Sequence, residues 1–349
     1  MPLVSLVIPT FNEQENIARL ITGIRQFLDS QYKYEILVVD DGSDDTCDIA
    51  QCLGATIVAG QHKGLGQAIV DGLRTSKGDV VVVMDADGSH PVASLPSMIN
   101  PILENKAEMT LGSRYVKGGS VVDWTTKREI ISKVASFLAY PITGLRDNTS
   151  GYFAVARSIL DGIDIEPSSW KIMLEVLVKV KPKRVIEVPI CFEDRKHGES
   201  KFNKKEVVSY LKHLVKLVVF KHQRFLKFAI VGATGIIVNF SILYFLTERI
   251  HFWYLASATL AVVVAASSNY LQNHYWTFAE KRENNPNIFI GWLKYLVAVG
   301  VTEVLYLGIM YLFTSIIGLW YMLSAVCALA ITTVLRFITA DRVIWGAKK

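Results

Sequence analysis

The chain has 349 residues, a net charge of +5 and a hydrophobic content of 51%, with a mean hydropathy of +0.31. It is too long for one ordinary domain and too apolar for a purely soluble protein, so part of it should lie in a membrane. Its Lys and Arg residues form no dense tract, which argues against a nucleic acid as a partner.

Residues 1–90 alternate apolar, strand-like runs with helical patterns. Apolar residues recur at Ile17, Leu20, Ile21 and Ile24, as on one face of a helix, and another helix should begin near Leu65. This βαβαβαβ order predicts an α/β domain with a mostly parallel sheet and helices on both faces. The strand-like runs are LVSLVIP (3–9), YEILVVDDGS (34–43), ATIVA (55–59) and DVVVVMDADG (79–88).

Polar clusters follow three of these runs, at 9–13, 40–43 and 85–87. Ligands of open α/β sheets bind beyond the carboxyl ends of the strands, so the three clusters should share one edge of the sheet. Asp85 and Asp87 should point to the same side of an extended segment. Two carboxylates there would repel each other unless a hard cation, Mg²⁺ or Mn²⁺, bound them together with a substrate diphosphate. The alternative is a solvated turn.

Residues 204–221 predict an amphipathic helix. Its polar face would carry Lys205, Ser209, Lys212 and Lys216. The pattern is typical of a helix that lies among lipid headgroups, and the alternative is a helix packed on the soluble domain. The apolar face would consist of Val207, Val208, Leu211, Leu214, Val215 and Val218.

Four apolar stretches follow residue 225, each close to the ~20 residues that cross a bilayer. Lys and Arg gather before the first stretch, between the second and third, and after the fourth. The positive-inside rule therefore predicts that the N-terminal domain, the middle loop and the C-terminus face the cytoplasm. Aromatic residues such as Trp345 fall near the span ends, and Glu303 lies within the third span, where it is either functional or bonded to a neighbouring helix. The stretches are 228–246, 252–271, 295–317 and 319–335.

Six motifs, in order, resemble those of glycosyltransferase family 2 enzymes of the dolichol-phosphate mannose synthase type, which have a GT-A fold. The C-terminal half, with RFLKFAIVGATGIIVNF (224–240) and NHYWTF (273–278), is similar to GtrA-like four-helix membrane domains. The six motifs are VIPTFNE (7–13), VVDDGSDDT (38–46), DADGSHP (85–91), GSRYVKGG (112–119), TSGYFAV (149–155) and EVPICFEDRKHGESK (187–201).

The resemblance implies a multi-pass protein of the cell membrane. A cytoplasmic GT-A catalytic domain would cover residues 1–202, an interfacial helix 203–224, and a transmembrane domain with four helices 225–349. The implied reaction transfers a hexose, with GDP-mannose as the expected donor, to a polyprenyl or dolichyl phosphate. The anomeric centre would be inverted, because the acceptor phosphate attacks from the face opposite the leaving group.

The resemblance also assigns residues to the donor. Asp85 and Asp87 would hold the metal, and the third ligand, a Gln in some relatives, falls on Ser89. Lys171, Arg195 and Lys201 would neutralise the phosphates, which suits Lys and Arg side chains, and the loop 195–201 would close over the donor. The nucleotide-sugar pocket would be lined by Pro9, Phe11, Glu13, Val38, Asp40, Asp85 and Ala86.

On the acceptor side, Arg114, Arg128 and Ser132 match positions that bind the lipid phosphate, with Asp87 as a further catalytic residue. The alternative for Arg114 is a structural ion pair. Ile130, Ile131, Val134, Phe137 and Leu138 would give their helix an apolar face toward lipid, or else pack in the core.

Other functions stay open at this point. The donor could be UDP-glucose or another UDP-sugar, since the motifs do not define base or sugar. In a different class, the protein could be a lipid-linked sugar translocase whose cytoplasmic domain only binds its ligand. A processive polysaccharide synthase is disfavoured because the chain has no Q-x-x-R-W motif.

Overall fold

The structure is a computed structural model that describes residues 1–163, 165, 171–194 and 204–346. The chain divides into two compact units, Met1–Lys221 and His222–Lys349. Each unit is described by itself below.

The first unit is built on a seven-stranded sheet with the order β3-β2-β1-β4-β7-β5-β8. Only β7 runs antiparallel to its neighbours, so the expected mostly parallel sheet is confirmed. Strand β4 lies in its middle with Val80–Val83 buried on both faces, as its unbroken run of valines predicts. The strands are β1 (Leu3–Thr10), β2 (Lys33–Asp40), β3 (Thr56–Ala59), β4 (Val80–Val83), β5 (Met109–Ser113), β7 (Phe153–Ala156) and β8 (Val185–Pro189).

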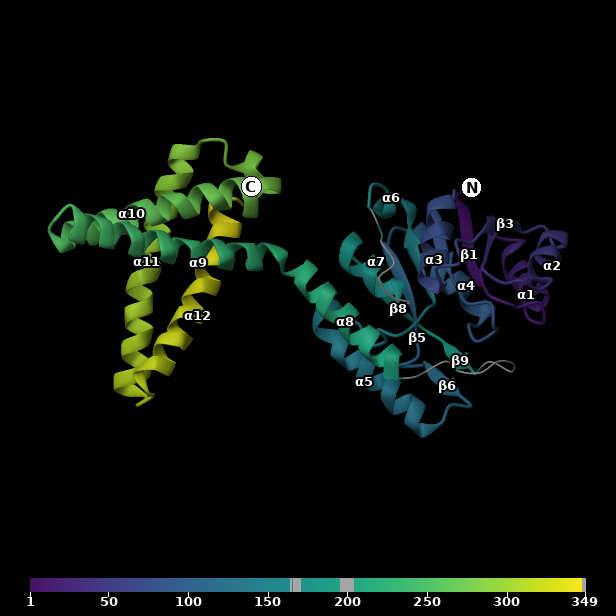
Figure 1. Cartoon of the computed structure of the whole chain (residues 1–349). Helices are drawn as coiled ribbons and strands as arrows, with labels where there is room; N and C mark the ends of the chain where they lie inside the picture. Colours follow the sequence, from purple (N-terminus) through teal and green to yellow (C-terminus); the bar gives the residue numbers. More distant parts are fainter. Residues whose placement is uncertain (164, 166–170, 195–203, 347–349) are drawn as a thin grey trace. The chain divides into compact units, whose positions relative to one another are not determined.

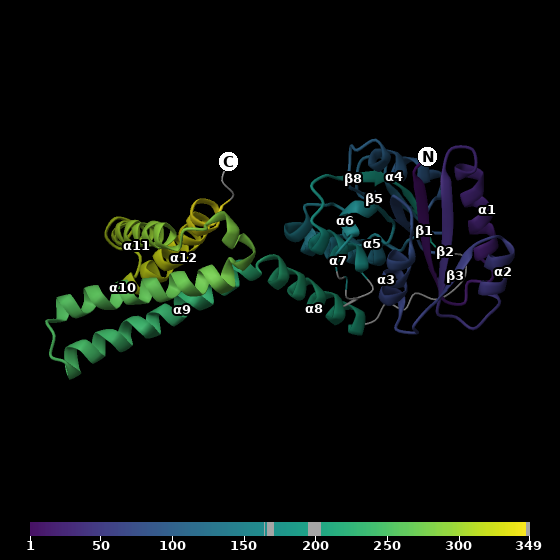
Figure 2. The same cartoon turned by 90° about the horizontal axis from the view of Figure 1, so that it is seen from above.

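Helices cover both faces of this sheet (Figure 2). On one face α1 (Ile17–Leu28) and α4 (Leu95–Leu103) pack against the side chains of Val4, Leu6 and Ile8. On the other face α3 (Leu65–Thr75) and α7 (Ile172–Val180) pack against Val7 and Val39. Smaller elements of this unit are α2 (Thr46–Cys52), a 3-10 turn (Val92–Ser94), α6 (Arg157–Leu160), and a two-stranded parallel sheet of β6 (Ser120–Val122) and β9 (Cys191–Glu193).

The strand register brings the polar clusters to one edge of the sheet. Thr10 at the end of β1 pairs with Asp40 at the end of β2, and Val7 pairs with Val83, two residues before Asp85. Because β7 is antiparallel, the loop that precedes it lies at the same edge, beside the end of β5. Residues far apart in sequence therefore meet at one rim, as the topology rule predicts.

Two long helices, α5 (Thr126–Thr143) and α8 (Lys204–Lys221), lie side by side (Figure 1). The Tyr210 hydroxyl donates a hydrogen bond of 2.8 Å to the carbonyl oxygen of Ala135 on α5. Tyr210, His213, Leu214 and Leu217 form the buried side of α8, at helical spacing. The prediction that Leu214 belongs to the membrane-facing side is therefore wrong, because it packs into the core of this unit.

The outer side of α8 is also apolar. Val207, Val208, Leu211, Val215 and Val218 are exposed, and Phe137 on α5 has 76% of its surface exposed. The helix therefore combines both interpretations of its sequence, since one side packs on the domain and another side leaves apolar residues uncovered. Exposed apolar residues of α5 besides Phe137 are Ile130, Val134, Leu138 and Tyr140.

The second unit contains four helices long and apolar enough to cross a membrane, which confirms the predicted spans by length and composition. Each span extends beyond at least one of its predicted limits, because helical structure continues past the apolar core into polar and aromatic residues. The spans are Gln223–Arg249, Tyr254–Thr277, Ile288–Ile316 and Tyr321–Ile344, each an α-helix (α9 Gln223–Tyr244, α10 Tyr254–Gln272, α11 Ile288–Tyr311, α12 Tyr321–Thr339) that ends in a π-helical turn.

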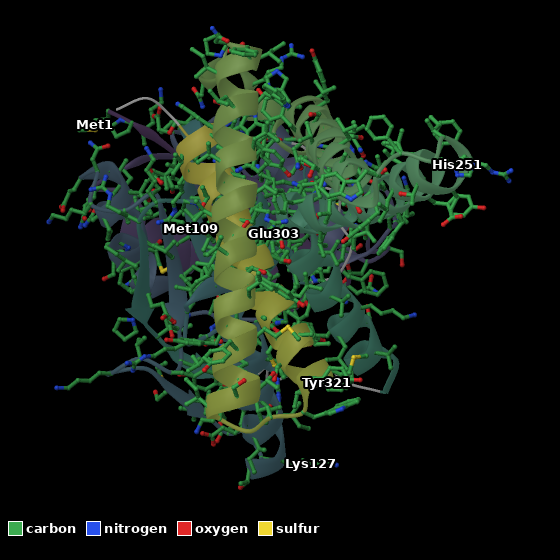
Figure 3. All side chains as sticks on the ribbon, turned by 90° about the vertical axis from the view of Figure 1, so that its left-hand side faces the viewer. Met1, Met109, Lys127, His251, Glu303 and Tyr321 are labelled. Carbon is green, nitrogen blue, oxygen red and sulfur yellow. The ribbon has the colours of Figure 1, made fainter. Side chains whose placement is uncertain are left out.

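Glu303 lies midway along α11 (Figure 3) and is paired with the neighbouring helix. Arg336 of α12 donates from Nη2 to Glu303 Oε1 at 3.0 Å and from Nε to Thr302 Oγ1 at 2.9 Å. Trp345, at the end of the fourth span, is fully buried and stacks on Phe278 with 4.5 Å between ring centroids. It packs in a cluster with Phe228, Tyr270 and Tyr295, so its ring is covered by the other helices.

Gly72 in α3 allows this helix to approach β1 closely. A Cβ at this position would lie 2.2 Å from Val7 Cγ1. We expect Gly72→Ala to destabilise the protein by about 1–3 kcal/mol through overpacking, measured as a lower midpoint of thermal unfolding in detergent. Gly23→Ala in α1 is the matched control, since its Cβ would meet only the end of Val92 at 3.2 Å. An equal loss in both variants would contradict the prediction.

Candidate active site

Two carboxylates, Asp85 and Asp87, follow β4 at the rim of the sheet. Asp87 Oδ1 accepts hydrogen bonds from the Ser89 backbone N–H at 3.0 Å and from Ser89 Oγ at 2.6 Å. Asp85 is half-buried, and its backbone N–H donates to His90 Nδ1 at 3.0 Å. The segment after β4 is thus a structured turn that presents both carboxylates, and Ser89 supports Asp87 directly.

The His90 ring is buried behind Asp85. Because Nδ1 accepts a hydrogen bond, the ring proton is on Nε2, which lies 3.7 Å from Asp85 Oδ2. Tyr152 stacks on the ring at 5.0 Å between centroids, and Phe192 contacts it edge-on at 5.7 Å. His90 is not among the predicted site residues, although it stands in the DADGSHP motif.

The donor set of this turn suits a divalent cation that shares its ligands with a substrate. Mg²⁺ typically takes one or two protein carboxylates and completes its shell with water and phosphate oxygens. Among the described residues no group of three or more His, Cys, Asp or Glu side chains is arranged to hold a metal. Asp85 and Asp87 would therefore hold the ion only together with a diphosphate.

The expected nucleotide-pocket residues differ in how exposed they are. Phe11 has 58% of its surface exposed and can offer its ring to a base. Val38 and Ala86 are buried in the core, and Pro9 lies within the buried strand β1. Glu13 and Asp40 are bonded to nearby protein groups. Glu13 Oε2 accepts from Asn16, and Asp40 Oδ1 accepts from Thr10 Oγ1 at 2.6 Å.

Arg114 makes a buried, bidentate ion pair with Asp147. Nε and Nη2 donate to the two carboxylate oxygens at 2.7 and 2.6 Å, and the Arg114 backbone N–H donates to Oδ2 at 2.9 Å. Burial alone would lower the pKa of Arg114 and raise that of Asp147, but their hydrogen bonds and opposite charges outweigh burial and hold both groups charged. The alternative of a structural ion pair for Arg114 is thus what the structure shows.

A hydroxyl cluster connects this pair to α5. Arg114 Nη2 also donates to Thr149 Oγ1 at 2.7 Å, and Thr149 Oγ1 lies 2.9 Å from Ser132 Oγ and 3.3 Å from Ser136 Oγ. The structure therefore brings together Arg114 and Ser132, which are predicted acceptor residues. Arg128 lies four residues before Ser132 on the same helix and pairs through Nη1 with Asp194.

Lys171 precedes α7, and its Nζ donates to the carbonyl oxygen of Thr149. Burial and the charge of Arg114 lower the pKa of Lys171 to about 7, although Asp85 and Asp147 act in the opposite direction. Lys171 is thus within electrostatic range of both Asp85 and Arg114. Arg195, Lys201 and the loop 195–201 lie outside the described residues.

Residues 5–164 match the family model described as glycosyl transferase family 2, and residues 227–345 match GtrA/DPMS, transmembrane domain. The dolichol-phosphate mannosyltransferase of Pyrococcus furiosus is 35% identical, over 98% of this chain and 99% of the relative. The chain belongs to the dolichol-phosphate mannosyltransferase family. The expected glycosyltransferase with a membrane domain is confirmed.

A second curated relative and a solved structure are also similar to this chain. The dolichol-phosphate mannosyltransferase of Saccharomyces cerevisiae is 33% identical, over 62% of this chain and 87% of the relative. A solved mannosyl-3-phosphoglycerate synthase from Rubrobacter xylanophilus has a TM-score of 0.51 at 23% identity, over 64% of this chain and 75% of that chain. The latter similarity concerns the fold alone, and it confirms the GT-A-type sheet domain.

The sequence analysis missed Asp147, Thr149 and Trp124. Thr149 is the first residue of the TSGYFAV motif, and Asp147 lies two residues before it. Proximity to a motif is therefore the signal that could have found them. The ion pair itself joins residues 33 positions apart in the chain. Such a partner is visible only once β5 and β7 are known to be neighbours.

Removal of Asp147 should be more harmful than removal of the whole ion pair. Asp147→Ala leaves Arg114 buried and unpaired, which should cost about 3–5 kcal/mol, whereas Arg114→Met with Asp147→Leu should cost much less. The midpoint of thermal unfolding of the purified protein in detergent measures both. A double variant as unstable as Asp147→Ala would contradict a buried ion pair.

The low pKa of Lys171 predicts a pH dependence of nucleotide binding. As the pH rises through about 7, Nζ loses its proton and positive charge, so affinity for GDP with Mg²⁺ should fall. In Lys171→Arg the side chain stays charged, so the affinity for GDP should no longer fall between about pH 6 and about pH 8.5. Calorimetric titration at several pH values tests this, and an identical fall in both proteins would assign it to another group.

Proposed function

We propose that this protein transfers mannose from GDP-mannose to a dolichyl or other polyprenyl phosphate, with inversion and with Mg²⁺ or Mn²⁺ as cofactor. One observation carries the proposal. The carboxylates that follow β4 and the arginine that follows β5 lie at the same rim of the sheet, beside a helix with an exposed apolar face. A site for two phosphate-bearing substrates, one of them a lipid, needs these parts.

The donor would bind at the carboxylate side of the rim. Asp85 and Asp87 would hold the metal, which would withdraw charge from the departing diphosphate. Lys171 would add a positive charge next to it, and Phe11 offers an exposed ring for the base. Asp40, which accepts a hydrogen bond from Thr10, and Glu13 would line the pocket.

The acceptor would bind at the arginine side. Arg128 and Ser132 would donate to phosphate oxygens, and the buried Arg114, held by Asp147, would add its positive charge beside them. A hollow of about 300 Å³ beside α5 is lined by Tyr115, Lys133, Ser136, Phe137, Tyr140 and Arg146. Its aromatic rings and cations suit the first part of a polyprenyl phosphate.

The chemical step needs no separate general base. A phosphate oxygen of the acceptor forms the new bond to the anomeric carbon while the bond from that carbon to the GDP oxygen breaks. GDP leaves with the electron pair, and the protein contributes by positioning two anions that would otherwise repel each other. Attack opposite the leaving group inverts the anomeric centre.

Helices α5 and α8 would contact the membrane surface, and the four spans would cross the membrane. The exposed apolar residues of α5 and α8 would enter the headgroup region, and the positive-inside distribution favours a cytoplasmic position for the sheet domain, the middle loop and the C-terminus. We propose this sidedness together with the domain limits 1–202, 203–224 and 225–349.

The proposal predicts metal-dependent transfer of labelled mannose into a chloroform-soluble product. Membranes that contain the protein are given dolichyl phosphate, Mg²⁺ or Mn²⁺, and GDP-mannose or UDP-glucose in parallel. Label should enter the lipid from GDP-mannose, and Asp87→Ala should lower the rate at least about 100-fold because it removes transition-state stabilisation.

One control variant and two possible results of the assay separate the alternatives. Cys52→Ser, at an exposed position on α2, should leave the rate unchanged. If transfer occurred only from UDP-glucose, the proposed donor would be wrong, but the protein would still be a sugar transferase that acts on a lipid phosphate. Absence of transfer from any donor, while GDP still binds, would favour a translocase with a non-catalytic binding domain.

A further inference from the structure

One indole ring contacts both arginines of the acceptor side. The Cζ atom of Arg114 lies over the Trp124 ring at 5.0 Å from its centroid, and the Cζ atom of Arg128 lies over it at 4.3 Å. Trp124 stands between β6 and α5 and is held edge-on by Phe192, with 5.4 Å between centroids. Its N–H is enclosed and has no acceptor within the described parts of the chain. The faces of the Trp124 ring contact the two guanidinium groups.

The two arginines differ in how firmly their carboxylates are held. The Arg114–Asp147 pair is buried, with side-chain exposures of 5% and 0%, whereas the Arg128–Asp194 pair has exposures of 32% and 27%. A partly exposed ion pair contributes little free energy. Arg128 can therefore exchange Asp194 for another anion at low cost, while Arg114 keeps its partner.

A guanidinium can bind an aromatic ring and an anion at the same time. Its N–H donors point outward in the plane of the group, and its face stacks on the ring. Contact with Trp124 thus leaves the edge of Arg128 free to change from a carboxylate to a phosphate. Among the aromatic side chains, tryptophan forms the strongest cation–π contacts.

We propose that Trp124 is a positioning residue for the acceptor phosphate: it keeps the guanidiniums of Arg114 and Arg128 in place while Arg128 exchanges Asp194 for the phosphate of the lipid. This inference rests on the proposed acceptor site. It adds a role to a residue that would not itself have to touch the substrate.

The test is steady-state kinetics of the full chain in detergent, with a short-chain polyprenyl phosphate and the sugar nucleotide that supports transfer. Trp124→Leu should raise the KM for the lipid phosphate about tenfold through loss of both cation–π contacts. The KM for the sugar nucleotide should stay within about twofold. Trp124→Phe should give an intermediate KM for the lipid phosphate.

A series of fluorinated tryptophans at position 124 separates positioning from folding. Fluorine withdraws charge from the ring face at nearly constant shape, so the KM for the lipid phosphate should rise stepwise with each added fluorine. Trp276→Leu is the matched control, since Lys227 lies over that ring at 5.6 Å in the second unit and its loss should not change the KM.

The outcomes distinguish this inference from the proposed function. If Arg128→Ala raises the KM for the lipid phosphate but Trp124→Leu does not, the role of Trp124 is overturned and the acceptor site stands. If Trp124→Leu acts only through a lower thermal midpoint, with no trend in the fluorinated series, Trp124 is structural. If Arg128→Ala has no effect on that KM, the acceptor site itself is misplaced.

Discussion

The arrangement of the rim depends on one buried ion pair, Arg114 with Asp147. It joins the end of β5 to the loop before β7, two segments that the sheet brings together from distant parts of the chain. Thr149 is bonded to this pair and to Ser132 on α5, and Lys171 is bonded to the same loop. The pair therefore positions a helix, a loop and a lysine at once. A buried arginine needs such a carboxylate, because an unpaired charge in the interior is strongly unfavourable.

Charge is distributed along the rim in a way that suits a reaction between two anions. The turn after β4 is acidic, the end of β5 and the start of α5 are basic, and Lys171 lies within range of both. A cation at the acidic turn would reverse its sign, so that a diphosphate could bind beside a second phosphate. Repulsion between the substrates is then overcome by fixed charges, which need no rearrangement when the bond breaks.

The helices α5 and α8 show how a catalytic domain can be prepared for a lipid surface. One side of α8 is part of the domain core through Tyr210, Leu214 and Leu217, so the helix is anchored before any lipid is present. Its other side, with the outer face of α5, leaves apolar residues exposed. An acceptor that enters from the membrane would meet these residues and then the hydroxyl cluster around Thr149. Uncovered apolar surface of this kind marks an interaction site in a soluble domain.

The sequence by itself determined the sheet domain, the four spans and the place of the carboxylates. Strands and spans are encoded by local patterns, such as the valine run of β4 and stretches of about 20 apolar residues. The DADGSHP turn follows a strand directly, so Asp85 and Asp87 could be located without a structure. Tertiary structure alone decided which groups face each other. Asp147 as the partner of Arg114, the two sides of α8, the burial of Trp345 and the shared indole of Trp124 all depend on contacts between distant segments, and no local pattern encodes such contacts.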